Sequence, residues 1–132
     1  MRTLIVEDDF TSRILLQKIL SPYGLCDVAV NGREALEALE LAHREGQPYQ
    51  LACLDIMLPE LNGQEVLKAL RALEKERGIP DREECKVVMT TCLDSPKEVM
   101  EAYYRGGCTA YLVKPIERQK LLGTLREFGL IG

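Results

Sequence analysis

Short, mostly apolar runs alternate along the chain with longer segments in which apolar residues recur at helical spacing. The runs, each short enough for a buried β-strand, lie at residues 4–6, 27–30, 51–54, 87–89 and 111–113. The amphipathic segments that follow them predict helices at about residues 11–20, 33–45, 64–77, 95–106 and 117–128. Because strands alternate with helices, the pattern predicts an α/β fold with a parallel sheet, helices on both faces and right-handed crossovers.

Polar residues come directly after four of these runs. They are the acidic pair Glu7-Asp8, the single carboxylate of Asp55, the hydroxyl of Thr91 and the amine of Lys114. The carboxyl ends of parallel strands share one edge of a sheet, which is where open α/β sheets bind ligands. We therefore expect these side chains to converge on one cleft.

The residues after the third run indicate where Asp55 lies. A carboxylate sealed in an apolar core would cost several kcal/mol. Pro59 rules out a continuing central strand, and Asn62-Gly63 is a strong turn signal. Asp55 is therefore expected where the strand passes into a loop, facing the cleft.

The expected set of groups has a defined chemistry. Three carboxylates in one small cleft repel one another and raise their own pKa values. Carboxylates with a backbone carbonyl and waters suit Mg²⁺, which relieves that repulsion. An amine and a hydroxyl opposite the metal suit the oxygens of a phosphoryl group. A carboxylate between them can be the nucleophile and form an aspartyl phosphate.

Length, charge and cysteine content narrow the class of protein. At 132 residues the chain is expected to be a single domain, residues 1–132. A net charge of −4 and a pI of about 5.1 argue against nucleic acid as a direct partner. No apolar run approaches the roughly 20 residues of a membrane span, and the strand-like start excludes a signal peptide. The 5 cysteines form no CxxC pair, which favours reduced thiols in a cytoplasmic protein.

Four sequence segments together give the chain a family resemblance. VEDDFTSR carries the acidic pair, DIMLPELNG the aspartate, VVMTTC the threonine and YLVKP a lysine before proline. In this order they resemble the receiver domain of bacterial two-component response regulators, of the single-domain type found in chemotaxis. The resemblance implies a flavodoxin-like, doubly wound (βα)5 fold whose parallel sheet has the strand order 2-1-3-4-5.

The same resemblance implies a function in a phosphorelay. Such a domain takes a phosphoryl group onto an aspartate from the phosphohistidine of a histidine kinase or phosphotransfer protein, and it requires Mg²⁺. It then changes its surface for a downstream protein, which the resemblance does not identify. It is a signalling module and not an enzyme in the usual sense, because it catalyses only its own phosphorylation and dephosphorylation.

Carried over position by position, the resemblance assigns a role to each residue of the cleft. Asp55 is the phosphoacceptor, Thr91 the switch threonine and Lys114 the contact to the phosphoryl group. Tyr111 is the aromatic residue that senses the switch. The family also implies a cis peptide bond between Lys114 and Pro115.

The metal ligands implied by the resemblance depend on the spacing to Arg13. The family places an arginine about five residues after the second acid, which makes Glu7-Asp8 the acidic pair. Asp8 is then a direct ligand beside the phosphoacceptor, Glu7 acts through water, and Met57 lends its backbone carbonyl. In the less favoured register the pair is Asp8-Asp9. In the favoured Glu7-Asp8 register, Asp9 is expected to cap the first helix.

Two other functions fit the same strand-end pattern less well. A phosphatase with an Asp nucleophile commonly has a second Asp two residues later as general acid, and Met57 stands there instead. An FMN carrier on the same fold needs a phosphate-binding loop after the first strand. The acidic run Glu7-Asp8-Asp9 would repel the phosphate of that cofactor.

Overall fold

The computed structural model describes residues 1–92, 97 and 107–132. The strands are β1 (Thr3–Val6), β2 (Cys26–Ala29), β3 (Leu51–Asp55), β4 (Lys86–Thr91) and β5 (Ala110–Val113). The helices are α1 (Phe10–Leu20), α2 (Gly32–Arg44), α3 (Gly63–Glu76) and α5 (Arg118–Glu127), with 3₁₀ turns at Ser21–Tyr23 and Asp81–Glu83. Apart from Lys97, which is helical, the helix predicted over residues 95–106 lies outside the described residues.

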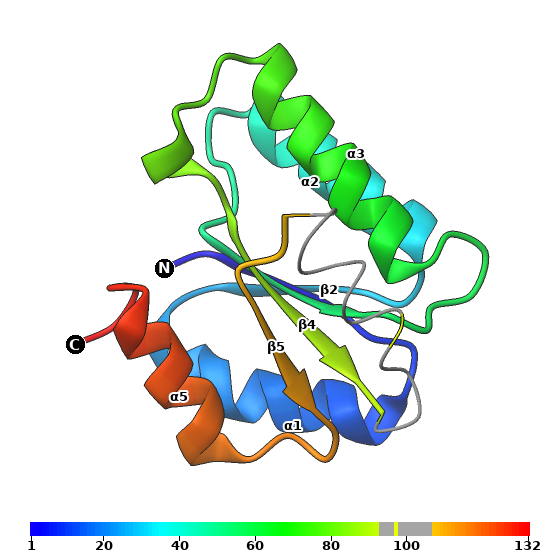
Figure 1. Ribbon diagram of the computed structural model, residues 1–132, viewed down its shortest axis with the longest axis vertical. Coiled ribbons are helices and arrows are strands. Elements are labelled where there is room, and N and C mark those ends of the chain that lie inside the picture. The colour runs from blue at the N-terminus through cyan, green and yellow to red at the C-terminus, as the bar shows by residue number, and fades with distance from the viewer. Residues whose placement is uncertain (93–96, 98–106) are drawn as a thin grey trace.

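The strands form a single parallel sheet in the order β2-β1-β3-β4-β5. Helices α2 and α3 lie against one face of this sheet, and α1 and α5 lie against the other (Figure 1). This confirms the predicted doubly wound, flavodoxin-like fold and its strand order. Within the described parts of the chain, no helix has the length and apolar character needed to cross a membrane.

Strand β3 runs through the middle of the sheet and is buried on both faces. Ala52 and Leu54 belong to the apolar core under α2 and α3, whereas Leu51 and Cys53 belong to the core under α1 and α5. Burial on both faces explains why this strand reads as a continuous apolar run and does not alternate with polar residues. Asp55 is the last residue of the same strand.

A capping box and a close backbone contact define the junction between β3 and α3. Asn62 accepts a hydrogen bond from the N–H of Glu65, and the Glu65 side chain accepts one from the N–H of Asn62, so the two form a capping box. The helix therefore begins at Gly63, one residue before the predicted start. A Cβ at Gly63 would lie 2.3 Å from the carbonyl oxygen of Asp55, so glycine is required for this close approach.

Strand β4 extends beyond the predicted residues 87–89. Thr90 pairs with Asp55 on β3, and Thr91 pairs with Val113 on β5. Both threonines are 2% exposed, and their β-branched side chains suit a strand. Thr91 is consequently held in the sheet, one strand away from Asp55.

A buried ion pair joins α3 to the starts of β4 and β5. Glu74 on α3 is 3% exposed; one of its oxygens accepts a hydrogen bond of 2.7 Å from the N–H of Cys85. The other oxygen pairs with Arg71 at 2.6 Å. Arg71 also donates two hydrogen bonds, 2.9 and 3.1 Å long, to the carbonyl oxygen of Gly107. Glu74 therefore satisfies a backbone donor and a charge that are both largely removed from water.

We expect Glu74→Ala to lower the free energy of unfolding by roughly 3 kcal/mol, because it leaves the Arg71 charge and the Cys85 N–H without this acceptor. Urea denaturation followed by circular dichroism measures the change. Glu76→Ala, an exposed position on the same helix, is the control and should change the free energy by less than about 0.5 kcal/mol. Equal midpoints for the two variants would contradict this role of Glu74.

Candidate metal and phosphoryl-transfer site

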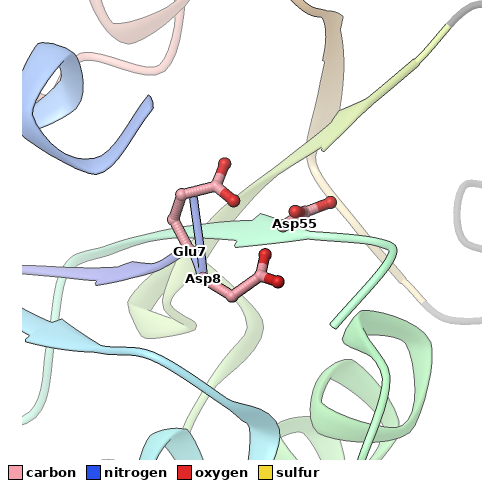
Figure 2. A group of neighbouring side chains, drawn as sticks. All are labelled: Glu7, Asp8 and Asp55. Atoms are coloured by element: carbon pink, nitrogen blue, oxygen red, sulfur yellow. The ribbon is translucent and has the colours of Figure 1, made fainter. Parts of the chain in front are cut away.

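Three acidic side chains meet at the carboxyl edge of the sheet. Glu7 and Asp8 follow β1, Asp55 ends the neighbouring strand β3, and one ligand oxygen from each lies within 4.8 Å of the others. Figure 2 shows the three carboxylates directed toward a common space. Glu7 is fully buried and Asp55 is 6% exposed, whereas Asp8 is exposed to solvent. The structure thus brings together the acidic residues that the sequence predicts.

Lys114 reaches the same cluster from the end of β5. Its Nζ lies 2.6 Å from Oε1 of Glu7 and 3.0 Å from Oδ2 of Asp55. The backbone N–H of Lys114 donates to the carbonyl oxygen of Thr91 at 2.7 Å, and the Lys114–Pro115 peptide bond is cis, as predicted. Burial alone would lower the pKa of Lys114, but its hydrogen bonds to Glu7 and Asp55 raise it.

The charges and geometry of the three carboxylates suit a divalent cation. Burial and the nearby Asp55 carboxylate raise the pKa of Glu7 to about 7, although Lys114 acts in the opposite direction. Burial is the largest cause of this shift, and the interaction with Asp55 adds to it. Carboxylate oxygens that are close together and open to solvent through Asp8 suit Mg²⁺ with bound waters.

Asp9 has a different role from the acidic pair. Its Oδ2 accepts hydrogen bonds from the N–H of Ser12 at 3.0 Å and from the Ser12 hydroxyl at 2.7 Å, so it caps α1. These hydrogen bonds lower the pKa of Asp9. Arg13 donates to the backbone carbonyl of Glu7 at 3.2 Å. The predicted cap is confirmed, and Asp9 is not among the three clustered carboxylates.

Met57 and Thr91 lie near the cluster, and of the two only Met57 donates a hydrogen bond to one of its carboxylates. The N–H of Met57 donates to Oδ1 of Asp55 at 3.0 Å, while its side chain is 60% exposed. The hydroxyl of Thr91 donates to the carbonyl oxygen of Cys92 at 3.1 Å. Thr91 therefore lies at the predicted edge of the sheet, and its hydroxyl is hydrogen-bonded to the backbone of the next residue.

Tyr111 lies on β5, where it pairs with Met89 of β4 and is 45% exposed. It is on the strand that leads to Lys114, as predicted.

Two exposed apolar residues, Phe10 and Met57, each stand two positions after an acidic residue of the cluster, and we call them the apolar rim; the sequence patterns did not indicate their exposure. Phe10 is 65% exposed, and the Arg13 guanidinium lies 5.5 Å from the centre of its ring. A cleft of about 490 Å³ is lined by Asp8, Met57, Leu58 and neighbouring residues of the loop after β3. The sequence predicts that the first helix begins at about residue 11, directly after Phe10, but the exposure of this ring depends on the neighbouring elements.

Comparison with known proteins identifies the relatives of this chain. Residues 3–126 match the family described as "Response regulator receiver domain". The polar-differentiation response regulator DivK of Brucella ovis is 35% identical over 125 residues, which cover 95% of this chain and 93% of DivK.

Solved structures agree with this match. One is the co-crystal structure of the Saccharomyces cerevisiae histidine phosphotransfer signaling protein Ypd1 with the receiver domain of its downstream response regulator Ssk1. It matches with a TM-score of 0.81 and 29% identity, over 98% of this chain and 88% of that one. The receiver domain of the Arabidopsis thaliana histidine kinase CKI1, complexed with Mg²⁺ and BeF₃⁻, gives a TM-score of 0.80. Its 24% identity, over 97% of this chain and 89% of that one, shows a shared fold.

The family match spans nearly the whole chain, and the acidic residues that hold Mg²⁺ in such a site, Glu7, Asp8 and Asp55, are in place. The chain therefore belongs to the response regulator receiver domain family, whose members are phosphorylation-activated signalling modules of two-component systems and not classical enzymes.

Proposed function

We propose that Asp55 is the residue of this receiver domain that accepts the phosphoryl group, within a single domain formed by residues 1–132. The observation that carries the proposal is the position of Lys114 Nζ, 3.0 Å from Asp55, beside two further carboxylates. A carboxylate oxygen of Asp55 attacks phosphorus while the P–N bond of a partner's phosphohistidine breaks. The leaving imidazole keeps the electron pair of that bond and takes up a proton.

Each neighbour of Asp55 has a separate task in this proposal. Lys114 neutralises an oxygen of the transferred group, and bound Mg²⁺ supplies further charge neutralisation. Asp8 is the direct protein ligand with Asp55, Glu7 acts through water, and Met57 contributes its backbone carbonyl. Support comes from the three carboxylates, which offer ligand oxygens within 4.8 Å of one another, and from the exposure of Asp8, which opens the cluster to a hydrated ion.

We assign the conformational switch to Thr91 and Tyr111. The Thr91 hydroxyl now donates to Cys92, and new oxygens on Asp55 are stronger acceptors because they carry negative charge. Turning the hydroxyl toward them vacates space beside β4. Tyr111 on the adjacent strand, 45% exposed, can bury its ring there, which is worth roughly 1.5–3 kcal/mol.

The phosphodonor, a histidine kinase or phosphotransfer protein, is proposed to dock on the apolar rim of the site. Phe10 and Met57 are 65% and 60% exposed and lie close in sequence to the acidic residues, so a partner can cover both while it presents its histidine. The downstream protein is proposed to bind the surface around Tyr111 and Lys120, where a cleft of about 390 Å³ lies.

We place the protein in the cytoplasm because all 5 cysteines are free thiols.

Incubation with acetyl phosphate and Mg²⁺ should add one phosphoryl group to the chain, detected by intact mass. Asp55→Asn should abolish this gain, because the amide is not a nucleophile for this step. Asp27→Asn, an aspartate on β2 outside the cluster, is the control and should be phosphorylated normally. Phosphate on the Asp55→Asn variant would show that another group is the acceptor, and full phosphorylation in EDTA would contradict the requirement for Mg²⁺.

Asp8→Ala should weaken Mg²⁺ binding about tenfold or more, whereas Asp9→Ala should change it by less than about twofold. The physical reason is that the Asp9 carboxylate is committed to the cap of α1. Asp9→Ala should instead lower the stability by about 1 kcal/mol. Calorimetric titration with Mg²⁺ and thermal unfolding separate the two effects, and the register is wrong if Asp9→Ala is the variant that loses the metal.

Thr91→Val, which removes the hydroxyl but keeps the shape, should abolish the response of Tyr111 to beryllofluoride in amide NMR spectra. Thr90→Val is the matched control, because Thr90 is equally buried on β4 and its hydroxyl donates to the Leu54 carbonyl. That control should keep the response of Tyr111. If both variants keep it, the switch does not pass through Thr91.

A further inference from the structure

A groove separate from the phosphorylation cluster lies between α2 and the loop that joins β3 to α3. It has a volume of about 490 Å³ and is lined by Arg33, Leu36, Glu37, Glu40, Glu60 and Leu61. The first four are at positions i, i+3, i+4 and i+7 of α2, so they lie on one face of that helix. The other two come from the loop.

The groove combines an apolar floor with an acidic rim. Leu36 and Leu61 are partly buried and pack against the core under α2 and α3. Glu37, Glu40 and Glu60 are exposed at the rim. In the described part of the chain, none of these three carboxylates takes part in an ion pair. Arg33 is the only basic residue among the described residues that line the groove, so the three glutamates leave the groove with an excess of negative charge.

The two walls of the groove are held against each other. A Cβ at Gly32 would lie 1.9 Å from the carbonyl oxygen of Leu61, so the loop touches the first residue of α2. Leu61 donates to the carbonyl oxygen of Pro59 at 2.8 Å. Between them, Glu60 has a φ of 66°, a left-handed conformation that is strained for a residue other than glycine. The contact at Gly32 therefore fixes the loop against α2, and a preformed surface costs less to occupy.

We propose that this groove is a docking site for a cationic amphipathic helix of a partner protein. Leucine-like side chains of that helix would cover Leu36 and Leu61, while its lysines or arginines would pair with the glutamates of the rim. This is the usual way in which a helix binds a groove, with apolar anchors one turn apart. The charge of the rim excludes nucleic acid and anionic lipid as occupants and favours a basic segment.

The test uses a fluorescein-labelled helical peptide with leucines along one face and lysines on both sides of them. Its binding to the full chain is measured by fluorescence anisotropy. The double variant Glu37→Lys and Glu40→Lys should weaken binding about tenfold, because two attractive charges become repulsive. The control is Glu45→Lys with Glu127→Lys, which makes the same change of net charge at exposed positions outside the groove. It should change binding by less than about twofold.

Two further measurements complete the test. A peptide with serines in place of the leucines should bind at least about tenfold more weakly, since the floor of the groove is apolar. Amide NMR shifts caused by the leucine peptide should be largest at Leu36, Glu40 and Leu61. Equal losses in the two charge variants, full binding of the serine peptide, or shifts centred elsewhere would overturn the proposal. Phosphorylation of Asp55 is measured separately, so its failure would not be mistaken for failure of the groove.

Discussion

The ammonium group of Lys114, placed between two buried carboxylates, is the interaction on which the rest of the site depends. Glu7 and Asp55 are almost completely removed from water, and isolated carboxylates in such positions would cost several kcal/mol each. Nζ of Lys114 lies 2.6 and 3.0 Å from them and offsets part of that cost. Because one positive charge cannot balance three carboxylates, the cluster has an excess of negative charge that favours a bound cation.

This arrangement requires that β1, β3 and β5 end at one edge of the sheet. Parallel strand order supplies the edge, and local features then bring the loops into place. Gly63 lets α3 begin against the carbonyl of Asp55, and Asp9 caps α1 directly after the acidic pair. Both contacts fix the start of a helix beside the carboxylates that the strand ends bring together.

The loop over residues 56–62 connects the phosphorylation cluster with the acidic groove on α2. At one end the N–H of Met57 donates to Asp55, and at the other the carbonyl of Leu61 rests against Gly32. The same short loop therefore contributes residues to both surfaces.

The residues of the cluster could be predicted from sequence because each follows an apolar run, and strand ends in a parallel sheet must meet. Periodicity likewise predicted the alternation of strands and helices around a parallel sheet, with element boundaries that differ from the observed ones by at most two residues. Tertiary structure alone decided that Glu74 is buried on the inner face of α3, since only the nearby Cys85 N–H and Arg71 make burial of a carboxylate tolerable.

Tertiary structure also decided that the Thr91 hydroxyl points to Cys92 and that Leu36 and Leu61 form the floor of an acidic groove. A pattern of apolar and polar residues reports which side chains face the core. Hydrogen-bond partners and grooves depend on atoms from segments far apart in the chain, and their distances are defined only once the sheet has formed.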